Sequence, residues 1–166
     1  TAEVEAKERA AGWRPLRVEW KFAFPLGGLT ISGKIDRIDR HADGRVRVLD
    51  YKTSDTAVSP DKAHWRAVRD DDHARPEWLR CTDTEGKARA WTDLQLPMYL
   101  RAVAAEWGDA VACGYFNLPK ASGETAVIMW SDYSREIQAA AERCAEGVAA
   151  AVVAGEFWPP KELAGR

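Results

Sequence analysis

Two short runs of β-forming residues constrain the fold most, because each carries an acid among apolar neighbours. They are residues 33–39, with Asp36 in the middle, and residues 48–52, where Asp50 is followed by Lys52. Side chains alternate along a strand, so Asp50 and Lys52 must point to one face and Leu49 to the other. Charges inside a buried run are costly unless they are compensated. A divalent cation held by acids of neighbouring strands would compensate them.

The hydrophobic pattern around these runs predicts a layered α/β domain, of the α+β kind, built on a mixed sheet. The chain has 166 residues, 46% of them hydrophobic, which suits one domain over residues 1–166 with a single core. About five strands are expected, flanked by helices. The expected strands cover residues 17–24, 29–40, 45–53, 110–118 and 125–130, and the expected helices cover residues 1–11, 92–107 and 131–155.

Short polar motifs in the sequence predict one hairpin turn and the starts of two helices. Residues 42–44, Ala-Asp-Gly, predict a hairpin between the second and third strands. Thr92 and Asp93 are expected to cap the middle helix, and Ser131 or Asp132 the last one. Three consecutive hairpin strands followed by a crossover helix favour a mixed sheet over a parallel one.

Residues 54–90 form a charged insertion between the third strand and the middle helix. Its one helix-like piece is residues 61–69, a candidate for gripping phosphates while an aromatic ring stacks on a base. The residues at helical spacing in that piece are Lys62, Trp65, Arg66 and Arg69. The alternative is a surface loop whose tryptophans pack on the sheet.

Several classes of protein are disfavoured. The net charge of −2 does not indicate a nucleic-acid-binding protein, although basic residues outnumber acidic residues between Trp13 and Arg47. Cys81, Cys113 and Cys144 lack any metal-binding spacing, and no apolar run is long enough for a membrane span. We expect a cytoplasmic protein, and the start at Thr1 suggests a fragment of a longer chain.

Each charged motif has a simpler interpretation when it is taken alone. Asp36 could be a solvated strand charge, and Asp50 with Lys52 a same-face ion pair that contributes little. On adjacent strands of one hairpin, however, the three residues can form an acid–acid–lysine cluster. Mg²⁺ prefers carboxylate oxygens and accepts one or two protein acids with waters completing its shell.

The order of the motifs resembles that of the PD-(D/E)XK nuclease superfamily, specifically the RecB-type (AddB-like) domain at the C-termini of helicase–nuclease proteins. The resemblance extends over residues 17–118 and implies a restriction-endonuclease-like core. The residues that match the family's motifs are Glu19, Asp36, Asp50, Lys52, Gln95 and Tyr99.

The resemblance also implies roles. Asp36 and Asp50 would bind Mg²⁺ or Mn²⁺ together with the main-chain carbonyl of Tyr51, and Glu19 would approach the ion directly or through water. Lys52 would orient or help to deprotonate the attacking water. The remaining two matches, four residues apart on one helical face, would border the catalytic centre.

The resemblance therefore implies a DNA nuclease that acts in recombination or repair, with helicase-like domains in the same or a partner chain. We expect an exonuclease and not an endonuclease. Two departures from the family matter: no histidine precedes His41, and no cysteine follows residues 157–160, so no iron–sulfur cluster is expected. The alternatives are a nuclease-like module that only binds DNA or proteins, and an unrelated structural domain.

Overall fold

A mixed sheet forms the centre of the computed structural model, which describes residues 2–120 and 125–156. Within those residues the sheet has five strands in the order β1-β2-β3-β7-β8. β3 pairs antiparallel with β2 and parallel with β7, so the predicted mixed sheet and α+β class are confirmed. The elements are α1 (Ala2–Ala10), β1 (Trp13–Leu26), β2 (Leu29–His41), β3 (Val46–Lys52), α2 (Pro60–His64), β4 (Trp65–Ala67), η1 (Asp70–Ala74), η2 (Glu77–Leu79), β5 (Arg80–Thr82), β6 (Ala88–Trp91), α3 (Gln95–Trp107), β7 (Ala112–Asn117), β8 (Ala126–Met129) and α4 (Arg135–Val153).

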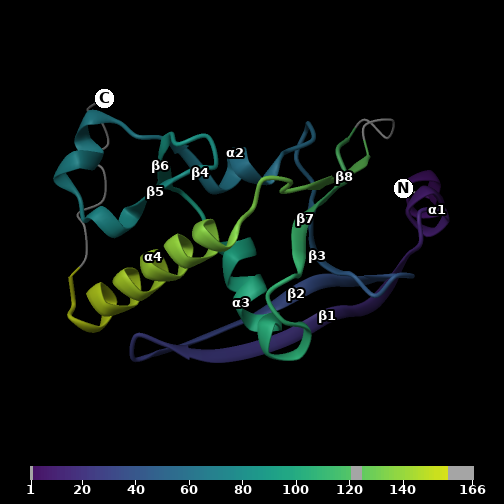
Figure 1. Ribbon diagram of the computed structural model, residues 1–166, viewed down its shortest axis with the longest axis horizontal. Coiled ribbons are helices and arrows are strands. Elements are labelled where there is room, and N and C mark those ends of the chain that lie inside the picture. The colour runs from purple at the N-terminus through teal and green to yellow at the C-terminus, as the bar shows by residue number, and fades with distance from the viewer. Residues whose placement is uncertain (1, 121–124, 157–166) are drawn as a thin grey trace.

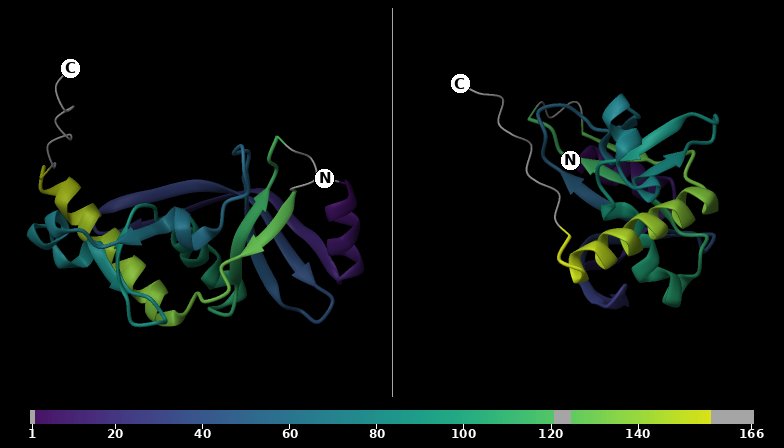
Figure 2. Two further views of the ribbon diagram at one scale, coloured as in Figure 1. Left: turned by 90° about the horizontal axis from the view of Figure 1, so that it is seen from above. Right: turned by 90° about the vertical axis from the view of Figure 1, so that its left-hand side faces the viewer.

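The helices lie on both faces of the sheet (Figures 1 and 2). α3 and α4 lie on one side, and α1 lies on the other (Figure 2). The main core fills the space between the sheet and α3, where Ile38 and Val48 meet Leu96 and Val103. The long β1–β2 hairpin reaches out to α4, and a Cβ on Gly27 at its tip would lie 2.7 Å from the Cβ of Ala149. In the described part of the chain, no helix is long and apolar enough to cross a membrane.

The insertion contains a second, smaller sheet, and the helix predicted over residues 61–69 is present only as far as His64 and is wrong beyond it. α2 ends at His64, and the chain then extends into β4, which pairs with β6. Trp65 lies opposite the partly buried Trp91 in that pairing, and burial of the Trp65 indole outweighs the local helical spacing. Among the described residues, the smaller sheet has the strand order β4-β6-β5.

Two helix caps also differ from the prediction. α4 is capped by Ser134, whose side chain accepts a hydrogen bond from the Ile137 amide, and not by Ser131 or Asp132. α3 begins at Gln95 after Leu94, while the carboxylate of Asp93 accepts a hydrogen bond of 2.7 Å from the Gln95 amide. The acid predicted as a cap therefore still stabilises the start of α3, from one position further back.

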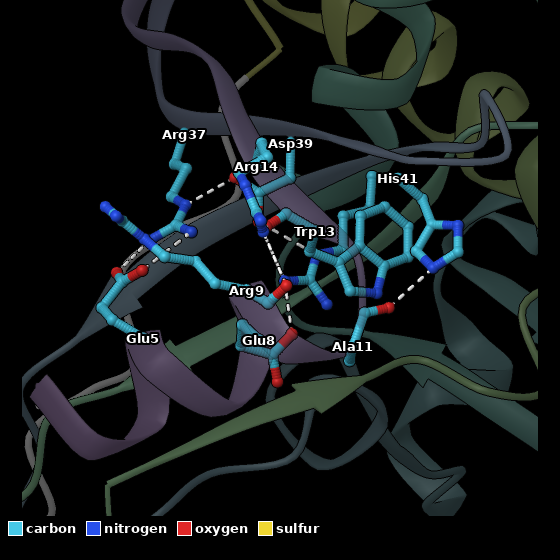
Figure 3. Close-up of polar contacts among 10 residues, drawn as sticks. Glu5, Glu8, Arg9, Ala11, Trp13, Arg14, Arg37, Asp39 and His41 are labelled. Atoms are coloured by element: carbon cyan, nitrogen blue, oxygen red, sulfur yellow. Dashed lines mark hydrogen bonds and ion pairs between the residues drawn. The ribbon is translucent and has the colours of Figure 1, made fainter.

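A layer of buried ion pairs fixes α1 to the sheet (Figure 3). The fully buried carboxylate of Asp39 accepts hydrogen bonds from Arg37 Nε at 2.6 Å and Arg47 Nη2 at 2.9 Å. The same guanidinium groups donate to Glu5 and Glu8 of α1. α1, described over its whole length, contributes no buried residue, so charge pairing and not a hydrophobic stripe holds it.

Replacing Asp39 with alanine leaves both guanidinium groups buried without the carboxylate that they share. We expect Asp39→Ala to lower the free energy of unfolding by about 3 kcal/mol or more, the usual cost of removing one partner from a buried ion pair. Urea unfolding measures the change. The matched control is Asp55→Ala, which removes a surface pair with Lys120 and should cost less than about 1 kcal/mol. Similar costs for the two variants would contradict this account of α1.

Candidate metal centre

Asp50 and Lys52 lie together near the C-terminal end of β3, on the face covered by α3. The Asp50 side chain is only 5% exposed, and its Oδ2 lies 2.7 Å from Lys52 Nζ. Tyr51 points to the opposite face, where its ring packs against Phe116. The alternation predicted for residues 49–52 is thus confirmed, and it places an acid and a base side by side in a partly dry environment.

Asp36 approaches from β2 at the point where the β2–β3 ladder ends. The ladder pairs Arg37 with Leu49 as its last register position on this side. Beyond that position, Asp36 Oδ2 accepts a hydrogen bond of 3.0 Å from the Tyr51 amide. The side chain of Asp36 thus provides the acceptor for β3 where the main-chain pairing has ended. This contact anchors the Asp36 carboxylate beside Asp50.

The environment of Asp50 disfavours its ionised form. Burial is the largest cause, and it raises the pKa of Asp50; the nearby Asp36 carboxylate raises it further, while Lys52 lowers it in opposition. Asp36 and Asp50 are therefore close enough for one carboxylate to raise the pKa of the other. Two acids held this close, one of them buried, form a centre that a bound cation would stabilise.

Gln95 and Tyr99 of α3 join the centre through a chain of hydrogen bonds. Lys52 Nζ donates to Gln95 Oε1 at 2.9 Å, and Gln95 Nε2 donates to the Tyr99 hydroxyl at 3.1 Å. The Tyr99 hydroxyl in turn donates to the main-chain carbonyl of Lys34 on β2 at 3.0 Å. The two residues share one helical face as predicted, and together they connect Lys52 to β2.

Glu19 is apart from these acids. It lies in β1 between Val18 and Trp20, which pair with Arg37 and Ile35, so it faces the Asp36 position of β2. Its side chain, 73% exposed, instead forms an ion pair of 2.6 Å with Lys34. Glu19 also has a φ of 49°, a left-handed conformation that is unusual for a residue with a side chain.

The donor set fits a hard divalent cation with a small number of protein ligands. Over residues 2–120 and 125–156, no three His, Cys, Asp or Glu side chains converge closely enough to hold a metal on their own. The pair Asp36 and Asp50 remains, and Mg²⁺ is commonly bound by one or two carboxylates with waters in its other positions. The charge and the oxygen chemistry of this pair therefore suit Mg²⁺ or Mn²⁺ better than a softer metal.

The four candidate DNA-contacting residues are not arranged as predicted. Trp65 is 5% exposed and packs against Trp130, so its ring is not available to stack on a base. Arg66 makes two hydrogen bonds, of 2.6 and 2.8 Å, to the carboxylate of Asp72. Lys62 and Arg69 are exposed, but on α2 and beyond β4 instead of on one helix.

Tyr115 was not identified from the sequence, and its ring packs against the ammonium group of Lys52. Its ring centroid lies 4.7 Å from Lys52 Nζ, and β7 places Tyr115 directly opposite Asp50 in the parallel ladder. Such a cation–π contact further fixes the ammonium group. The signal was present in the alternation of residues 112–117, but the register against β3 cannot be read from one strand.

Comparisons with known proteins found a family match and similar solved structures. The sequence model of a family described as the PD-(D/E)XK nuclease superfamily matches residues 1–164. No curated protein matches the chain. A crystal structure of a "Putative exonuclease" from Eubacterium rectale aligns at a TM-score of 0.49 with 15% sequence identity, covering 98% of this chain and 56% of that one. The chain thus spans little more than half of that protein.

The raised pKa of Asp50 predicts a pH dependence in the metal-free domain. A carboxyl whose pKa is raised on folding contributes stability below its ordinary value of 3.8, and this contribution is lost as the pH rises through the folded-state pKa. We therefore expect Asp50→Asn, which is neutral at every pH, to have a higher thermal midpoint than the wild type at pH 7 in EDTA.

Thermal unfolding between pH 4 and pH 8 measures this effect. The exposed Asp55→Asn serves as the control and should unfold like the wild type. A lower midpoint for Asp50→Asn than for the wild type at pH 7 in EDTA would show that the Lys52 ion pair outweighs burial.

Proposed function

Because the chain belongs to the PD-(D/E)XK nuclease superfamily, we propose that it is the metal-dependent DNA nuclease domain of a longer protein. The observation that supports this function best is the cluster of Asp36, Asp50 and Lys52. It combines two adjacent carboxylates with an ammonium group 2.7 Å from one of them. Nucleases of this superfamily generally use divalent metals such as Mg²⁺ or Mn²⁺.

Asp36 and Asp50 are proposed to hold the ion, with the main-chain carbonyl of Tyr51 as a further ligand. When bound, the ion supplies Lewis-acid polarisation of a phosphodiester and lowers the pKa of a bound water. Glu19 would reach the ion through a water molecule after leaving Lys34. Its position between Val18 and Trp20, whose partners in β2 flank Asp36, supports this role.

Lys52 is proposed to orient the attacking water and to balance the charge that develops on the phosphate. Its ammonium group has three N–H donors, and Asp50 and Gln95 engage two of them at 2.7 and 2.9 Å. Within residues 2–120 and 125–156 no hydrogen bond or ion pair engages the third, which we assign to the reacting groups. Gln95, Tyr99 and the ring of Tyr115 hold Lys52 in this orientation, so the lysine does not have to be ordered during the reaction.

The wider setting is also a proposal. The motif order supports a RecB-type domain that works in the cytoplasm on DNA during recombination or repair, beside helicase-like domains, and an exonuclease is favoured. The competing function is a module that binds DNA or proteins without cutting. The intact acid–acid–lysine cluster favours cleavage, since a binding module does not need two neighbouring acids of which one, Asp50, is buried.

Activity and its metal dependence are tested with end-labelled DNA, single- and double-stranded, in Mg²⁺, Mn²⁺ or EDTA. We expect cleavage only with a divalent ion. We expect Lys52→Met to lower the rate by about 10²-fold or more, because it removes a positioned charge from the reacting centre. Lys87→Met, which removes an exposed lysine of the insertion, is the control and should cleave like the wild type.

Equal cleavage by Lys52→Met and the wild type, or cleavage in EDTA, would contradict the proposal. Comparing linear with closed circular DNA separates the two modes of attack. An exonuclease leaves the circle intact.

Direct metal binding is a separate prediction. Titration calorimetry with Mn²⁺ should show one site in the wild type, and Asp36→Asn or Asp50→Asn should weaken it by about tenfold or more, since each loses a charged oxygen ligand. Glu19→Gln should weaken binding less, because Glu19 lies outside the pair. If the Glu19 variant loses binding while the Asp36 variant keeps it, the assignment of ligands is wrong.

A further inference from the structure

His64 is a fully buried histidine at the end of α2, in the insertion. Both of its ring nitrogens are engaged. The Leu96 amide, in the first turn of α3, donates to Nε2 at 3.2 Å, and Nδ1 lies 3.0 Å from the Pro60 carbonyl and 3.1 Å from the Tyr115 hydroxyl. A single side chain thus contacts α2, α3 and β7.

These contacts fix the protonation state of His64. Nε2 accepts a hydrogen bond, so it carries a lone pair, and the ring hydrogen is on Nδ1, where a carbonyl and a hydroxyl oxygen share it. A second proton on Nε2 would point at the Leu96 N–H. Burial, the largest cause, lowers the pKa of His64, and Lys52 lowers it too, against the opposing effect of Asp93. The neutral ring is the form that the packing requires.

The main chain of His64 strengthens the same connection. Its carbonyl accepts hydrogen bonds from the amides of Thr92 at 2.8 Å and Asp93 at 3.2 Å. The Thr92 hydroxyl donates to the carbonyl of Ala63 at 2.9 Å. The turn that leads into α3 is therefore attached to the end of α2 through both side chain and backbone.

The side chain of His64 is hydrogen-bonded to Leu96 and Tyr115, and both residues are connected to Lys52. Leu96 follows Gln95, whose side chain accepts a hydrogen bond from Lys52 Nζ. Tyr115 presents its ring to the same Nζ at 4.7 Å. The imidazole of His64 links these two residues. In the described structure it makes no hydrogen bond to Lys52, so it occupies none of the three N–H donors of the lysine.

From this geometry we propose that His64 is a positioning residue for Lys52. By linking the first turn of α3 to the Tyr115 hydroxyl, it sets the distance between the Gln95 amide and the Tyr115 ring, between which the ammonium group lies. The charged insertion then serves the active centre through His64, in addition to any contact with DNA. The catalytic part of this inference rests on the proposed nuclease function, whereas the structural part does not.

The test compares His64→Leu, which loses both nitrogens, with His64→Gln, whose amide can accept from Leu96 and donate to Pro60. We expect His64→Leu to lower kcat by about 10- to 100-fold with little change in KM, as displaced supporting groups do. His64→Gln should recover most of the loss. Ile137→Ala is the control for stability, because it removes a buried core side chain of α4 and should keep its kcat.

A second readout does not need activity. The ¹³Cε resonance of Lys52 in metal-free protein, assigned from its absence in Lys52→Arg, should shift in His64→Leu and stay in place in Ile137→Ala. Tyr115→Phe removes only the hydroxyl partner of Nδ1 and should shift the resonance in the same direction, which keeps the test valid if His64→Leu does not fold.

The outcomes separate the two proposals. If the wild type does not cleave DNA, the nuclease function fails, and the resonance shifts still decide the role of His64. An unshifted Lys52 resonance in both His64→Leu and Tyr115→Phe would overturn the positioning role. So would equal losses of kcat in His64→Leu and Ile137→Ala at equal thermal stability.

Discussion

The burial of the Asp50 carboxylate next to a second acid, Asp36, is the constraint on which the rest of the site depends. Charges attract and repel more strongly in a partly dry environment than in solvent. Lys52 compensates Asp50 only in part, since the pKa of Asp50 is still raised. A bound cation would add positive charge beside Asp50, and hydrogen bonds already hold Asp36 and Lys52 in place around it.

The scaffold holds this centre by placing charged layers on both sides of the same two strands. Asp36 and Asp50 point toward α3, whereas Arg37, Asp39 and Arg47 point toward α1 and are buried there. Strand alternation alone produces this division. The ion pairs with α1 stiffen the strands from behind, and we infer that this rigidity limits how far the carboxylates can separate.

The sequence allowed the sheet, the face shared by Asp50 and Lys52, and the partnership of Gln95 with Tyr99 to be predicted, because each depends on a local period of two or of three to four residues. The helix over residues 61–69 failed because Trp65 is buried against Trp91 and Trp130, contacts that no local pattern shows. His64 and Tyr115 were missed for a related reason, since their positions depend on how α2 docks against β7. Glu19 was expected near the ion, but its side chain pairs with Lys34, and neither this pair nor the left-handed backbone at Glu19 follows from a local pattern.

Crystals grown with Mn²⁺ test the central claim most directly, because anomalous scattering locates the ion independently of the protein. The account predicts one strong peak with an oxygen of Asp36 and an oxygen of Asp50 both about 2.0 to 2.2 Å away, and waters completing the shell. A peak bound elsewhere, or the two carboxylates facing apart with no ion between them, would contradict it.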